Sequence, residues 1–145
     1  YIINVQGDEP FIDPEDINTV IDIIQKNNVV GTLVSDLEED ERADRNVVKA
    51  LTNEIGEVIM FTRSPSYRNC KNLYKHIGIY GYPKDILDQI SIMKPSEGSI
   101  EDSLEQLTWL DNKISIKASL ALNQSLGIDT PEDLKKANQI YKQSR

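Results

Sequence analysis

Cysteine, histidine and long apolar runs are scarce in this 145-residue chain. A single cysteine, Cys70, cannot form an internal disulfide, which favours a reducing compartment over a secreted setting. No apolar run approaches the ~18 residues that span a bilayer, and no signal peptide is visible, so we expect no membrane partner and a cytoplasmic location. Basic side chains are in the minority, with 16 Lys and Arg against 24 Asp and Glu. The net charge of −8 argues against a nucleic-acid partner, because phosphate backbones are bound by clustered cations.

The length allows one domain with a core, since a chain of this size buries roughly 70% of its unfolded surface. Residues 1–145 are therefore expected to form a single domain. The chain begins at Tyr1, without an initiator methionine and already inside the β-branched run YIINV. This beginning suggests part of a longer protein.

Strands and helices are expected to alternate. Continuous or alternating apolar runs predict strands at 1–5, 29–34, 47–51, 57–62, 75–82 and 113–120, and helical spacing predicts helices from residue 14 and at 84–92, 100–110 and 131–141. Asp13 before Pro14, and Thr130 before Pro131, supply the N-caps of two of these helices. A tight turn near Gly56 predicts one hairpin. The pattern indicates a layered α/β fold with a mixed sheet.

Carboxylates follow the first strand in the stretch NVQGDEP, residues 4–10. Gly7 allows close backbone approach or unusual dihedrals, and Pro10 prevents the strand from continuing. Asp8 and Glu9 are left at the strand's carboxyl end, where open α/β sheets collect ligands. A second carboxylate, Asp129 in GIDTPEDL, either belongs to a capping arrangement or lies at the same sheet edge. At one edge, Asp8 and Asp129 could share one Mg²⁺, which takes oxygen ligands and is held by one or two carboxylates plus substrate phosphates.

The expected strand YKHIGIYGY, residues 74–82, contains the only histidine of the chain. Alternation places His76, Gly78 and Tyr80 on one face, so His76 and Tyr80 either pack structurally or reach a common ligand. A glycine inside a strand often marks close approach by another backbone or a ligand, which makes Gly78 a candidate for such a contact.

Three further features have a surface interpretation and a functional one. Glu105 and Gln106 flank the apolar stripe of the expected 100–110 helix and face either solvent or a pocket. Arg63 is either a surface residue or a clamp for carboxylate or phosphate, which suits its planar guanidinium. The charge run DLEEDERADR, residues 36–45, is expected to be a solvated loop.

Four motifs in order, NVQGDEP, HIGIYGY, LEQL and GIDTPEDL, closely resemble the 3-deoxy-manno-octulosonate (Kdo) cytidylyltransferase family. NVQGDEP alone is shared with related sugar nucleotidyltransferases. The resemblance covers essentially the whole chain. It implies a Rossmann-like, GT-A-like nucleotidyltransferase fold of three layers, incomplete at its N-terminus, in a cytoplasmic homodimer.

The implied reaction joins CTP and Kdo to give CMP-Kdo and pyrophosphate, with Mg²⁺, for lipopolysaccharide or capsule synthesis. By motif, the resemblance implies that Asp8 and Asp129 are catalytic metal ligands. It implies a sugar pocket lined by residues from several motifs: Gln6, His76, Tyr80, Glu105 and Gln106. Arg63 matches an arginine of the family and is also expected to bind substrate.

The chain departs from the family pattern at three points. The family's glycine- and arginine-rich nucleotide loop is absent, so the 145 residues alone are expected to bind nucleotide poorly. TRSPSYRN lacks the Ile-Pro that usually follows the arginine matched by Arg63, and SIEDSLEQL carries one extra residue. Two alternatives stay open: a cytidylyltransferase for another acid sugar, such as a nonulosonate, and a non-catalytic binding or assembly module.

Overall fold

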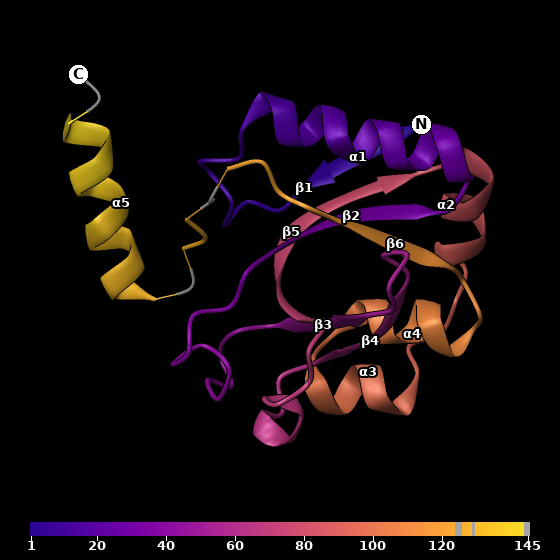
Figure 1. Cartoon of the computed structure of the whole chain (residues 1–145). Coiled ribbons are helices and arrows are strands. Elements are labelled where there is room, and N and C mark those ends of the chain that lie inside the picture. The colour runs from indigo at the N-terminus through magenta and orange to yellow at the C-terminus, as the bar shows by residue number, and fades with distance from the viewer. Residues whose placement is uncertain (124–125, 129, 144–145) are drawn as a thin grey trace.

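The computed structural model describes residues 1–123, 126–128 and 130–143 (Figure 1). Within these residues, one sheet contains β1 (Ile2–Val5), β2 (Val30–Ser35), β3 (Lys49–Thr52), β4 (Val58–Thr62), β5 (Leu73–Tyr82) and β6 (Ile116–Leu120). The helices are α1 (Pro14–Asn27), α2 (Lys84–Ile90), α3 (Glu97–Asp102), α4 (Glu105–Asp111) and α5 (Pro131–Gln143). The expected strands and the mixed α/β sheet are confirmed, with shifts of a few residues at the strand ends.

The long strand β5 organises the sheet, whose order is β4-β3-β5-β2-β6 with β1 also paired to β5. β5 runs antiparallel to β1, β2 and β3, whereas β2 and β6 are parallel. It follows that β1, β2 and β6 point in the same direction. Their carboxyl ends meet at one edge of the sheet, and the segments after them start from that edge.

The two faces of the sheet are covered by different helices. α1 packs on one face, where Val20 joins Leu33, Ile77 and Ile79 in a buried cluster. On the opposite face, Tyr80 packs with Trp109 of α4 and with side chains of α2. Figure 1 shows α1 above the sheet and α4 with α3 below it. The alternation along β5 thus gives Ile77 and Ile79 to the α1 face, and it leaves His76, Gly78 and Tyr80 for the other.

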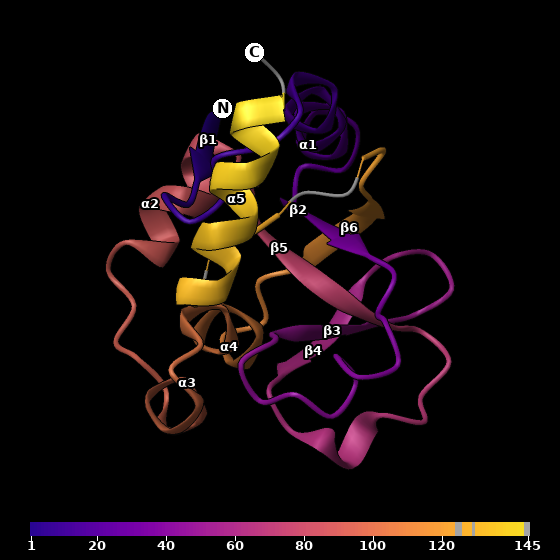
Figure 2. The same cartoon turned by 90° about the vertical axis from the view of Figure 1, so that its left-hand side faces the viewer.

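Local capping explains where α1 and α5 begin. The Asp13 carboxylate accepts a hydrogen bond from Glu15 N at 2.8 Å, directly before Pro14. Thr130 Oγ1 accepts from Asp133 N at 3.2 Å, while the Asp133 carboxylate accepts from Thr130 N at 3.0 Å. Both predicted N-caps are confirmed. Figure 2 views the molecule from the side on which α5 lies.

The predicted helix 100–110 is wrong: two short helices replace it. Ser103 adopts a left-handed conformation with φ 53° and ends α3, and Leu104 is the extended residue before α4. Leu104 is buried, whereas Ile100 stays 66% exposed, so these two residues do not share one core-facing stripe. The break reorients the chain just before Glu105 and Gln106.

The predicted hairpin between β3 and β4 is confirmed at Gly56, which has φ 81°. Gly56 N donates to Asn53 O at 3.1 Å, and Asn53 N donates to Glu57 O at 2.9 Å. A Cβ at position 56 would also clash with the Ala118 carbonyl of β6, so glycine is required here by conformation and by space.

Candidate functional site: a pocket over strand β5

The site begins where β1 and β3 leave a gap along the same edge of β5. Gln6 N, just past β1, donates to Gly78 O at 2.9 Å, and His76 N donates to Val48 O, just before β3, also at 2.9 Å. Gln6 and Val48 therefore flank β5 from two directions. Both line the cavity that opens over this part of the strand.

Gly78 is the point at which the turn after β1 lies against β5. Its N–H donates to Glu9 Oε1 at 3.1 Å, and a Cβ at this position would overlap Oε1 of Gln6. The prediction that Gly78 marks a close approach is confirmed, and the approaching group is the Gln6–Glu9 turn. The expectation of unusual dihedrals at Gly7 is wrong. Its φ is not in the left-handed region, and a Cβ there would meet no protein atom within 4 Å.

The two adjacent carboxylates have different environments. Glu9 is bound to the backbone of β5, as above, whereas Asp8 is exposed and lines a second cavity of about 450 Å³. The carbonyl of Asp8 accepts a hydrogen bond from Ile128 N at 2.8 Å. The segment after β6 therefore reaches the turn after β1, at the shared edge of the sheet. Asp129, the second predicted metal ligand, lies outside the described residues.

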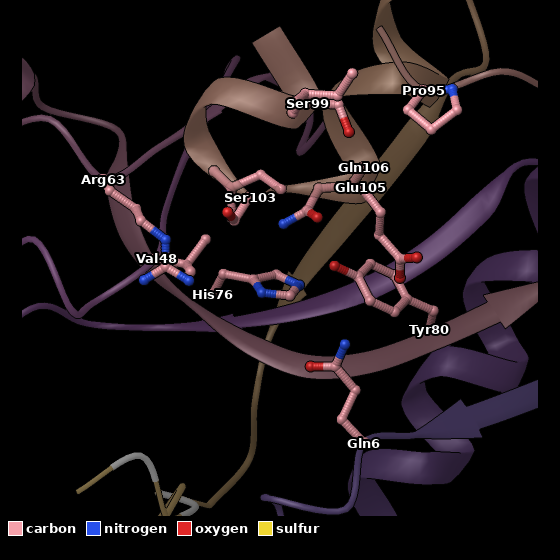
Figure 3. Close-up of a pocket in the computed structure, with 12 residues that line it drawn as sticks. Gln6, Val48, Arg63, His76, Tyr80, Pro95, Ser99, Ser103, Glu105 and Gln106 are labelled. Carbon is pink, nitrogen blue, oxygen red and sulfur yellow. The ribbon is translucent and has the colours of Figure 1, made fainter. Parts of the chain in front are cut away.

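The six residues expected to bind substrate converge. They come from four separate parts of the chain and line one cavity of about 630 Å³, a size suited to a small-molecule ligand. Figure 3 shows Arg63 and Tyr80 on opposite sides of His76, with Glu105 and Gln106 across the cavity. The converging residues are Gln6, Arg63, His76, Tyr80, Glu105 and Gln106.

Aromatic packing holds the floor of this pocket. The ring of His76 lies 5.1 Å from that of Phe61, edge to face, and 5.2 Å from that of Tyr80. Trp109 contacts Tyr80 edge to face at 5.1 Å. Burial lowers the pKa of His76 to about 3 and raises the pKa of Tyr80 well above its usual value. At neutral pH the floor therefore offers two uncharged polar rings.

Gln106 is buried, and Glu105 lines the cavity at the first turn of α4. The surface interpretation of this pair is therefore wrong for Gln106. The short helix that carries both residues is anchored by Trp109 and Leu104 in the core. Rigid placement on a packed element favours a precise site.

Arg63 is half-buried and lines both cavities. Its Nη1 donates to Asn46 O at 2.7 Å and to Arg45 O at 3.3 Å. The neighbouring Lys49 is fully buried, and its Nζ donates to Asp44 O at 2.5 Å and Val47 O at 2.9 Å. Four consecutive backbone carbonyls, 44–47, thus accept hydrogen bonds from two cationic side chains. We call residues 44–47 the carbonyl loop.

The predicted solvated loop at 36–45 is largely exposed, as expected, but it is also tied to the sheet. Glu41 forms an ion pair with Lys75 of β5 at 2.7 Å, and the Arg42 guanidinium donates to Arg68 O at 3.0 Å. Asp40, Glu41 and Asp44 line the second cavity together with Asp8. The charge run therefore forms one wall beside the candidate site.

Sequence reasoning missed Lys49 and Thr32. Thr32 is fully buried in β2, and its hydroxyl lies 3.0 Å from Nε2 of His76. A hydroxyl in the apolar strand VGTLVS, and a lysine in KALT, are the signals that could have found them, because buried polar groups require partners.

The arrangement of the sheet and its helices matches that of solved nucleotidyltransferase structures. A solved structure of CMP:2-keto-3-deoxy-manno-octonic acid synthetase complexed with CTP superposes with a TM-score of 0.87 at 34% identity, covering 99% of this chain and 62% of that chain. A glucose-1-phosphate thymidylyltransferase from Bacillus anthracis gives 0.64 at 19% identity, over 95% of this chain and 53% of that chain, and shares the fold.

The chain belongs to the cytidylyltransferase family, whose model matches residues 1–145. A 3-deoxy-manno-octulosonate cytidylyltransferase of Cytophaga hutchinsonii is 42% identical, over 92% of this chain and 58% of that protein. The enzyme of the same name from Parabacteroides distasonis is 38% identical, over 94% and 61%. The chain thus spans about three fifths of the length of these relatives. Among the described residues, no helix is long and apolar enough to cross a membrane.

Proposed function

We propose that the protein containing this chain transfers CMP from CTP to Kdo, releasing pyrophosphate. The observation that carries the proposal is the convergence of Gln6, His76 and Tyr80 with Glu105, Gln106 and Arg63 around one cavity. The similarity to named Kdo cytidylyltransferases, and to a structure complexed with CTP, supports it.

The chemistry explains the mixture of groups. Kdo carries a carboxylate and several hydroxyls, and its anomeric hydroxyl must attack the α-phosphorus of CTP in line with the departing pyrophosphate. Arg63 is the cation of the pocket and suits the carboxylate, while the uncharged His76 and Tyr80 suit hydroxyls. Fixed polar groups hold the sugar in one orientation and lower the entropic part of the barrier.

Mg²⁺ is the cofactor we propose, held by Asp8 and Asp129. Mg²⁺ is typically held by one or two carboxylates together with the phosphates of a substrate. Asp8 is exposed at the sheet edge, and its backbone is joined to Ile128, so an ion there would be open to a nucleotide. When bound, Mg²⁺ supplies charge neutralisation for the phosphoryl oxygens.

A cytoplasmic homodimer acting in lipopolysaccharide or capsule synthesis is part of the same proposal. It is supported by the family resemblance of the sequence motifs. Light scattering of the full-length protein tests the dimer.

The function is tested with the full-length protein. Pyrophosphate release is measured with CTP and a panel of acid sugars, with Mg²⁺ titrated from limiting to saturating. Turnover with Kdo is expected. Preference for a nonulosonate would reassign the sugar, and no turnover with any acid sugar would favour a binding or assembly module.

The metal assignment is tested with Asp8→Asn. Turnover is expected to fall by orders of magnitude with the fold intact, because a neutral amide holds a divalent cation poorly. Asp22→Asn is the matched control, since Asp22 is an exposed carboxylate of α1 paired with Lys26. Normal turnover of Asp8→Asn at limiting Mg²⁺ would refute the role of Asp8.

A further inference from the structure

The hydroxyl of Thr32 lies between the ring of His76 and the backbone of β5. Thr32 Oγ1 is 3.0 Å from His76 Nε2 and 2.8 Å from the carbonyl oxygen of Ile79. Thr32 is fully buried, so water does not compete for these two contacts.

A threonine hydroxyl has one proton, and a carbonyl oxygen can only accept. The Thr32 proton therefore goes to Ile79 O. If it were turned toward His76, two acceptor oxygens would face each other at 2.8 Å in a buried place, which is costly. With its proton committed, Oγ1 can only accept from His76, so Nε2 must carry a hydrogen.

The other ring nitrogen then determines what His76 offers to a ligand. Burial lowers the pKa of His76 to about 3, so the ring holds a single proton at neutral pH and Nδ1 has a free lone pair. No described residue is hydrogen-bonded to Nδ1. Among the described residues, the one buried side-chain polar atom without a partner is Oδ2 of Asp16. Nδ1 therefore keeps accessible surface, and His76 lines the pocket.

We propose that Thr32 is a positioning residue: it holds His76 as the Nε2–H tautomer, so that Nδ1 accepts a hydrogen bond from a hydroxyl group of the bound sugar. This rests on the proposed function of the pocket. An acceptor at this point repels carboxylate and carbonyl oxygens. The carboxylate of the acid sugar is therefore directed to Arg63, and the orientation of the sugar follows.

The tautomer is read directly by NMR of the full-length protein labelled with ¹⁵N-histidine. His76 is the only histidine of these 145 residues, and a His76→Asn spectrum identifies its signals if other histidines precede or follow them. At neutral pH we expect one protonated nitrogen, Nε2, and one unprotonated nitrogen, Nδ1. A wild-type spectrum of the Nδ1–H tautomer, or of the doubly protonated ring, would overturn the proposal without any variant.

Two substitutions separate the hydroxyl from the shape of the side chain. Thr32→Val keeps the branched shape and removes the acceptor, so the Nδ1–H tautomer should become populated. Thr32→Ser keeps the hydroxyl and should keep the wild-type tautomer. An unchanged tautomer in a folded Thr32→Val protein would show that Thr32 does not set it.

The functional arm is a steady-state measurement with Kdo and CTP. Loss of one buried hydrogen bond to a substrate corresponds to roughly a tenfold effect, so the KM for Kdo should rise about tenfold in Thr32→Val and little in Thr32→Ser, with the KM for CTP unchanged. A changed tautomer with an unchanged KM would overturn the role in sugar binding. If the wild type turns over no acid sugar, the proposed function fails instead, and the NMR result still decides the tautomer.

Discussion

Replacing Lys49 with methionine should weaken both the fold and the sugar pocket. Methionine preserves most of the buried apolar stem but removes the ammonium that donates to Asp44 O and Val47 O. A hydrogen bond from a charged group contributes about 1.5–3 kcal/mol. Two such bonds are lost, but burial of the charge already costs stability, as the lowered pKa of Lys49 indicates. We expect the free energy of unfolding to fall by about 2 kcal/mol.

Urea denaturation of the full-length protein measures this loss as a lower midpoint with an unchanged slope. Lys75→Met is the matched control. Lys75 faces Lys49 across the β3–β5 ladder and is also tied to the 36–45 segment, through Glu41, but its side chain is 35% exposed. A partly exposed ion pair contributes up to about 1 kcal/mol, so this variant should be the milder one.

The carbonyl loop links Lys49 to Arg63, because Lys49 binds its first and last carbonyls and Arg63 binds the two between them. Lys49→Met should therefore raise the KM for the acid sugar, and its effect should be non-additive with that of Arg63→Ala, since residues sharing one network couple by about 0.5–3 kcal/mol. Strict additivity, or a larger stability loss in Lys75→Met than in Lys49→Met, would refute the reasoning.

Three further outcomes are expected. Gly78→Ala should displace Gln6 from β5 and raise the KM for the sugar, whereas Gly98→Ala should not, because a Cβ at position 98 meets no atom within 4 Å. Equal KM values for the sugar in the two variants would show that the contact between Gln6 and Gly78 does not support sugar binding. The folded-state pKa of His76 is depressed from 6.5 to about 3, so between these pH values the unfolded state binds a proton that the folded state does not. The free energy of unfolding should therefore fall as the pH is lowered from 6.5 to 3, and urea titrations should show this decrease in the wild type and a smaller one in His76→Asn. Asp8→Asn should have a higher requirement for Mg²⁺ than Asp22→Asn in the pyrophosphate assay.

Local sequence signals predicted most of the secondary structure. The Asp13-Pro14 and Thr130-Pro131 pairs gave the starts of α1 and α5, because capping depends on neighbours in the chain. The prediction of one helix at 100–110 was wrong because it used only the local apolar spacing. That spacing suited one helix, and nothing in the residue type of Ser103 announces the left-handed conformation that divides α3 from α4.

The candidate site was less visible from the sequence, because its contacts join distant segments. His76 and Tyr80 could be assigned to one face of a strand by alternation, whereas the convergence of Gln6, Arg63 and Gln106 on that face depends on the sheet order. Their assignment to a single pocket came from the family resemblance. The partner of the glycine at position 78 could be expected only as an unspecified close approach, which the structure identifies as Gln6 and Glu9.

The amide of Gly78 provides a built-in reporter of the turn that follows β1. Its proton is held by the carboxylate of Glu9, whereas neighbouring β5 amides are protected by strand pairing. Hydrogen–deuterium exchange at this one amide should therefore follow excursions of the Gln6–Glu9 segment, while the amide of Tyr80, a residue that pairs with both β1 and β2, should exchange only when the sheet itself opens. If adding a ligand slows exchange at Gly78 alone, then ligand binding makes the Gln6–Glu9 turn more rigid and leaves the sheet unchanged.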